Sequence, residues 1–132
     1  MAVPKAVVQY LREALAPFRP RLVILFGSTA RGDVRPDSDL DVAVLLDEPL
    51  STPIVMEIID ALALASDRPV DLVDLHSVGE PLLGRILSEG LRIQGDTSEW
   101  GRLLSRHLFN QADFVPLQNR ILRTRREAWT KQ

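Results

Sequence analysis

Apolar residues recur at helical spacing in four stretches of the chain. Residues 4–16 show this spacing first, and it returns over about 53–66, over 81–89 and from residue 97 to about 128. A proline near the start of the first two stretches is compatible with a first helical turn, where a missing N–H costs nothing. The spacing predicts four helices.

Short apolar runs that are typical of strands lie between these stretches. The run at 21–26 is followed by Gly27, and the run at 39–46 begins polar and becomes wholly apolar. Residues 69–75 predict a third strand and residues 91–94 a shorter fourth one. Residues 29–38 are rich in turn formers and predict a loop, after a short helical turn that Ser28 can cap. This order of elements predicts an α/β fold.

Composition limits what such a fold can be. With 132 residues and 45% hydrophobic side chains, the chain fits one domain, with a core at about 1–95 and a helical C-terminal segment at about 97–128. A net charge of -2 argues against stable nucleic-acid binding. Cysteine is absent, so a metal has to be held by oxygen or histidine ligands. No apolar run is long enough to cross a membrane and no signal peptide is recognisable, so we expect a cytoplasmic protein.

Two aspartates at the start of the second predicted strand are candidates for chemistry. Asp39 and Asp41 are two residues apart, so on a strand both carboxylates leave the same face, with Cα atoms roughly 6.6 Å apart. Two such acids need a cation between them, and Mg²⁺ is the hard divalent ion that accompanies substrate phosphates. A bare pair of this kind is more often a strand-edge feature, but here Gly27 and Ser28 stand ten residues upstream, where a close turn can cradle phosphate.

Other phosphate motifs fit less well. A Walker-A loop needs a lysine after its second glycine, and the Gly27–Gly32 stretch has none. The dinucleotide fingerprint is missing as well. Arg31 can supply positive charge for phosphates in place of lysine, whereas Arg35 is as well explained as a solvated loop residue that pairs with a nearby acid.

The spaced motif resembles a known superfamily. Gly27-Ser28 followed by Asp39-Leu40-Asp41 matches the GSx10DxD signature of the DNA polymerase beta-like nucleotidyltransferases. The stretches 25–32, 38–44 and 70–75 look like its minimal members (MNT domains), and among these like the MntA-like antitoxins that accompany HEPN-type toxins of the HepT kind. The likeness covers most of the chain.

This resemblance implies a mixed β-sheet flanked by helices and a complete nucleotide site. Asp39 and Asp41 would bind two Mg²⁺ ions, and Gly27 and Ser28 would hold the triphosphate of ATP. Asp71 matches the third carboxylate of the family, a metal ligand that also helps to deprotonate the acceptor. Asp74 lies three residues further on and, by strand alternation, faces the other way.

The expected function is therefore Mg²⁺-dependent transfer of AMP from ATP to a partner HEPN-type toxin, on a tyrosine, as the resemblance suggests. Two alternatives stay open: an antitoxin that neutralises its partner by binding alone, and a nucleotidyltransferase that modifies small molecules. Acceptor, base preference and oligomeric state are not encoded in any motif of the sequence.

The remaining polar and aromatic residues favour structural roles. His76 and His107 show no metal-ligand spacing, and Trp100 and Phe114 occupy helical core positions. The C-terminal segment combines an apolar stripe that begins at Phe114 with a cluster of arginines. Such a cluster is usually a solvated helix end. The apolar stripe and the arginines together are also a candidate surface for a macromolecular partner. The stripe consists of Phe114, Leu117, Ile121 and Leu122, and the cluster of Arg120, Arg123, Arg125 and Arg126.

Overall fold

The computed structural model describes residues 4–31 and 38–114. Helices and strands follow one another in the order that the sequence predicts, and the bounds agree within about two residues. The predicted helix beyond residue 114, with the arginine cluster, lies outside the described residues. The elements are α1 (Lys5–Leu15), the 3-10 turn η1 (Ala16–Phe18), β1 (Leu22–Phe26), α2 (Gly27–Ala30), β2 (Leu40–Leu45), α3 (Thr52–Ser66), β3 (Val70–Asp74), α4 (Leu82–Glu89), β4 (Leu91–Gln94) and α5 (Thr97–Phe114).

The four strands form one mixed sheet in the order β3-β2-β1-β4. Strand β1 pairs antiparallel with both β2 and β4, whereas β2 and β3 are parallel and are joined through the crossover helix α3. The end of β1 therefore lies beside the start of β2. The parallel pairing brings the start of β3 to the same end of the sheet. The combination of parallel and antiparallel pairs confirms the expected mixed sheet.

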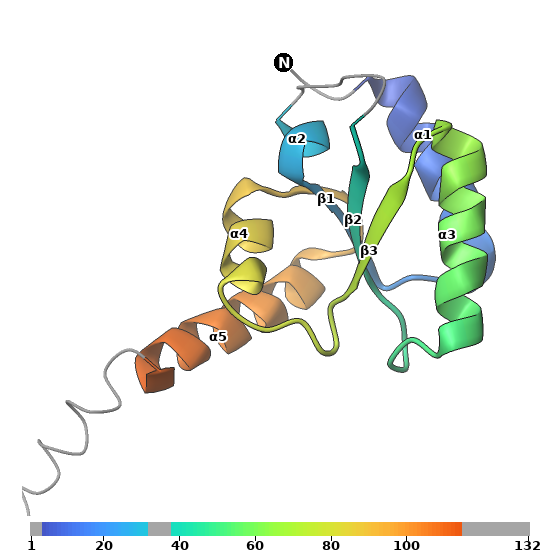
Figure 1. Cartoon of the computed structure of the whole chain (residues 1–132). Coiled ribbons are helices and arrows are strands. Elements are labelled where there is room, and N and C mark those ends of the chain that lie inside the picture. Colours follow the sequence, from blue (N-terminus) through green and yellow to red (C-terminus); the bar gives the residue numbers. More distant parts are fainter. Residues whose placement is uncertain (1–3, 32–37, 115–132) are drawn as a thin grey trace, which may run out of the picture.

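Helices cover both faces of this sheet (Figure 1), with α1 and α3 on one side and α2, α4 and α5 on the other. Strands β1 and β2 are buried on both faces because their side chains alternate between two apolar clusters. On β2, Val42 and Val44 face α1 and α3, and Ala43 and Leu45 face α4 and α5. Asp41 keeps this alternation and so lies on the α4 side.

Three local expectations were wrong. Strand β2 begins at Leu40, so Asp39 precedes the strand instead of forming its first residue. Helix α2 begins at Gly27, so Ser28 is its second residue and not its N-cap. The helical turn also continues through Ala30, into the stretch that the sequence predicts as loop.

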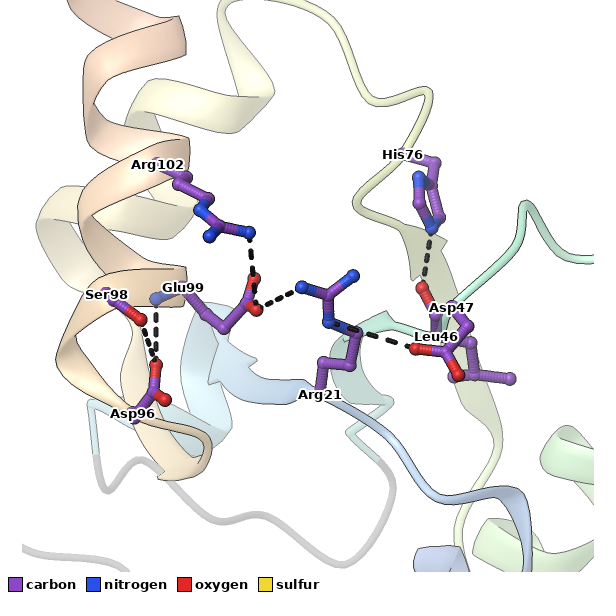
Figure 2. Close-up of polar contacts among 8 residues, drawn as sticks. All are labelled: Arg21, Leu46, Asp47, His76, Asp96, Ser98, Glu99 and Arg102. Carbon is purple, nitrogen blue, oxygen red and sulfur yellow. Dashed lines mark hydrogen bonds and ion pairs between the residues drawn. The ribbon is translucent and has the colours of Figure 1, made fainter.

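Helix α5 is tied to the far end of the sheet by polar contacts (Figure 2). The Arg21 guanidinium, just before β1, contacts the Glu99 carboxylate in the first turn of α5, and Arg102 reaches the same carboxylate at 3.7 Å. Asp96 caps the helix by accepting the Glu99 N–H at 2.9 Å. Further along α5, Arg106 donates to the carbonyls of Leu75, His76 and Val78. Within the described residues, no helix has the length and apolar character to cross a membrane.

Candidate active site

The turn at the end of β1 is built around Gly27. Its φ of +68° is a left-handed conformation that residues with a side chain rarely adopt. A β-carbon at this position would lie 2.1 Å from Oδ2 of Asp41 and 3.0 Å from its Cγ. The Asp41 carboxylate thus lies directly against the backbone of the turn, so both the conformation and the space require glycine.

Asp41 also meets Asp71 across the parallel pairing of β2 and β3. The two residues are direct partners in the register of these strands. The negative charge of Asp71 acts on Asp41, so the two acids form a closely spaced pair at this end of the sheet.

Burial and negative neighbours together raise the pKa of Asp41 above its ordinary value of 3.8. Partial burial is the largest cause, because it disfavours the charged form, and the charges of Asp71 and Asp39 follow. The positive charge of Arg31 works against this rise. Asp41 therefore ionises less readily than an exposed aspartate does.

Asp39 and Arg31 contribute charge from the edges of the site. Both side chains are exposed, yet each is close enough to influence Asp41. Arg31 follows α2, where its N–H donates to the Gly27 carbonyl at 3.3 Å. Ser28 is half-buried in α2. The structure thus brings all six predicted site residues to one end of the sheet: Gly27, Ser28, Arg31, Asp39, Asp41 and Asp71.

The carboxylates fit a divalent cation by their chemistry, although they do not yet surround one point. Within residues 4–31 and 38–114, no three acidic or histidine side chains gather closely enough to ligate a single ion as they stand. Asp41 and Asp71 are direct partners across the two strands, and Asp39 would complete a set of three. A cation would offset the negative charge of the pair, and Mg²⁺ prefers such oxygen ligands.

Other candidate residues take structural roles. Asp74 lies on the opposite face from Asp71 and accepts the N–H groups of Leu50 and His76, both at 2.9 Å. The His76 ring lies 2.6 Å from the Leu46 carbonyl, as Figure 2 shows. His107 pairs with Glu80 between α4 and α5 at 2.5 Å. These contacts explain both histidines without a metal.

One residue near the site escaped the sequence reasoning. The Arg68 guanidinium, in the turn before β3, donates to the hydroxyl of Ser38, which precedes Asp39, at 3.1 Å. The two residues are thirty positions apart, so no local pattern in the sequence could indicate this contact.

Comparison with known proteins agrees with this geometry. The family described as "Polymerase beta, Nucleotidyltransferase" matches residues 8–99, a range that contains every predicted site residue. The chain belongs to this family. The protein adenylyltransferase MntA of Shewanella oneidensis (strain MR-1) is 34% identical to this nucleotidyltransferase over 89 residues, which are 67% of this chain and 63% of the relative. The match therefore spans less than two thirds of that relative's length.

Solved structures resemble this nucleotidyltransferase over most of its length. A chain in a crystal structure of a toxin-antitoxin with AMP-PNP has a TM-score of 0.70 and 27% identity, covering 87% of this chain and 98% of that one. A second structure contains a tri-AMPylated Shewanella oneidensis HEPN toxin in complex with an MNT antitoxin. It matches with a TM-score of 0.66 and 25% identity, over 89% of this chain and 98% of that one.

Proposed function

We propose that this nucleotidyltransferase is a Mg²⁺-dependent protein adenylyltransferase, which transfers AMP from ATP to a hydroxyl of a HEPN-type toxin and so acts as its antitoxin. The observation that carries the proposal is the contact of Gly27 with Asp41, combined with the pairing of Asp41 with Asp71. A close turn for phosphates and a pair of acids for cations lie side by side, as nucleotide transfer requires.

The chemistry follows from the charges at this end of the sheet. The backbone of the Gly27–Ser28 turn and the Arg31 guanidinium would bind the triphosphate. Asp39, Asp41 and Asp71 would hold two Mg²⁺ ions, which neutralise negative charge on the phosphates and lower the pKa of an acceptor hydroxyl. Asp71, the exposed member of the carboxylate pair, would take the proton of that hydroxyl.

The transfer itself is an in-line displacement at the α-phosphorus of ATP. A bond forms between the acceptor oxygen and the α-phosphorus, while the bond from this phosphorus to the bridging oxygen of the β-phosphate breaks. Pyrophosphate leaves, and one AMP unit remains on the acceptor. Binding, charge and one proton acceptor suffice for this reaction, so a small domain can support it.

One surface pocket of the described residues lies away from the carboxylates. This pocket of about 400 Å³ lies beyond the C-terminal end of β2, where Phe18, Leu46 and Leu50 contribute to its lining. Asp41 lies at the other end of β2, so this pocket cannot present a small acceptor to the carboxylates. The relatives that carry toxin-antitoxin descriptions support a protein as acceptor. We place the reaction in the cytoplasm.

Intact-protein mass spectrometry tests this proposal. The protein is incubated with ATP, Mg²⁺ and the HEPN-type protein encoded beside it, and the partner's mass should increase by whole AMP units. Peptide sequencing should locate them on a tyrosine. A partner that is inhibited but keeps its mass would favour neutralisation by binding alone, and AMP found only on small molecules would favour the other alternative.

A further inference from the structure

The turn between α3 and β3 brings Arg68 to the segment that precedes β2. Asp67 ends α3 in a left-handed conformation, with φ of 56°, and its N–H donates to the Ala63 carbonyl at 2.8 Å. The chain therefore turns sharply into β3. The half-buried Arg68 side chain follows this turn and reaches the Ser38 hydroxyl.

This contact lies where regular pairing of the two strands stops. The register of β2 and β3 begins with Leu40 opposite Val70, and the Leu40 N–H donates to the Pro69 carbonyl at 2.8 Å. Asp39 lies one residue outside this ladder, with an exposed side chain. The register fixes Asp41 and Asp71 relative to each other, and its first pair, Leu40 and Val70, comes directly after Asp39.

Arg68 and Leu40 hold the chain on both sides of Asp39. The Leu40–Pro69 bond anchors the residue after it, and the Arg68–Ser38 bond anchors the residue before it. Both anchors lie directly before the strand that carries Asp71. Arg68 is half-buried, and its planar guanidinium donates to Ser38. Such a guanidinium loses little conformational entropy for each hydrogen bond that it makes, so it is well suited to hold a backbone segment in place.

We infer that Arg68 is a positioning residue of the cation site: through Ser38 it sets where Asp39 stands relative to Asp41 and Asp71. The inference rests on the proposed function only in taking these three carboxylates as the cation ligands. Because Ser38 directly precedes Asp39, the position of Ser38 influences where the Asp39 carboxylate lies and how readily the three ligands close around an ion. Partners of this kind around metal ligands typically change affinity about 10-fold to 100-fold when they are removed.

Titration with Mn²⁺, followed by electron paramagnetic resonance in the presence of a non-hydrolysable ATP analogue, measures the effect directly. Arg68→Ala and Ser38→Ala should each weaken Mn²⁺ binding about 10-fold. The double variant should be no weaker than either single one, because both remove the same contact. Arg85→Ala, which removes an exposed arginine from α4, should leave the affinity unchanged.

A background without the Asp39 carboxylate makes the test specific. In Asp39→Asn protein, Arg68→Ala should cause no further loss of Mn²⁺ affinity. Normal affinity in Arg68→Ala with a lowered melting temperature would reduce Arg68 to a structural residue and overturn the inference. Additive losses in the double variant would overturn it as well, because Arg68 would then act other than through Ser38.

Two further controls keep the outcomes distinct. Ser38→Ala leaves the arginine in place, so it decides the matter if Arg68→Ala does not fold. A wild-type protein that binds Mn²⁺ but transfers no AMP would contradict the proposed function, while the affinities of the variants still decide the role of Arg68. A wild-type protein that binds no Mn²⁺ even at millimolar concentration would overturn both.

Discussion

The carboxylate of Asp41 occupies the space that a β-carbon on residue 27 would need, at 2.1 Å from Oδ2. The turn expected to bind phosphate and the acid expected to bind a cation are therefore in direct contact. A change in either residue has to disturb the other, and this coupling makes the site testable with small substitutions.

Gly27→Ala should abolish nucleotide binding. The added methyl group would displace the Asp41 carboxylate, and the left-handed backbone would cost about 1–2 kcal/mol of stability for a residue with a side chain. Isothermal titration with an ATP analogue and Mg²⁺ measures the affinity, and thermal unfolding measures the stability. Gly101→Ala in α5 is the matched control, since its added methyl group would contact nothing within 4 Å. Unchanged nucleotide affinity in Gly27→Ala would place the phosphate site elsewhere.

Asp41→Asn should lose activity and gain stability. The amide removes negative charge that the cations need, so transfer should fall roughly 100-fold or more. The same change relieves repulsion by Asp71 and Asp39 in protein without divalent ions. Because these groups remain partly solvated, the gain should not exceed about 1 kcal/mol, or roughly 2–4 °C in melting temperature. Asp60→Asn on the exposed side of α3 should change neither property. A less stable Asp41→Asn protein would contradict the repulsion.

The stability difference between these two proteins should depend on pH. The folded state raises the pKa of Asp41, so it binds this proton more tightly than the unfolded chain does. The resulting stabilisation is complete below the ordinary pKa of 3.8 and is lost as the pH rises through the raised value. In EDTA, wild type and Asp41→Asn should therefore melt at similar temperatures in acid, and the variant should melt higher near neutrality. A constant difference across this range would exclude Asp41 as its source.

Asp71→Asn should lose activity but keep its stability, whereas Asp74→Asn should lose stability. Asp71 is exposed beside Asp41, so its amide should stop AMP transfer and leave the fold intact. Asp74 accepts two backbone N–H groups, and an amide keeps only one acceptor oxygen, so this variant should lose about 1–3 kcal/mol of stability. Activity assays well below the melting temperature separate the two effects. The reverse ranking in activity would show that Asp74 belongs to the reaction.

The sequence predicted the elements well because their signals are local. Apolar periodicity located the strands and helices, and alternation along β3 separated Asp71 from Asp74 before any contact was known. The boundary at Asp39 was missed because a run that begins polar and becomes apolar does not show at which residue strand pairing starts. Only the pairing of Leu40 with Val70 shows where the ladder begins.

Contacts between distant residues could not be predicted in this way. Arg68 meets Ser38 across thirty positions, and Arg21 meets Glu99 across seventy-eight. Each of these arginines is, by its local sequence, an ordinary solvated residue. Their roles depend on strand order and direction, and periodicity does not encode either of them.

The strand order β3-β2-β1-β4 also has a consequence for how the site forms during folding. Phe26 pairs with Asp41 only fifteen positions away, whereas Asp41 pairs with Asp71 at thirty. Doubling the length of a closed loop adds roughly 0.6 kcal/mol of entropic cost, and the parallel pairing also requires α3 to dock first. The antiparallel pairing of β1 with β2, which brings Asp41 close to Gly27, should therefore form early, in the folding transition state. The pairing of β2 with β3, which brings Asp71 close to Asp41, should form later. Substitutions at Asp71 should then alter the rate of unfolding much more than the rate of folding.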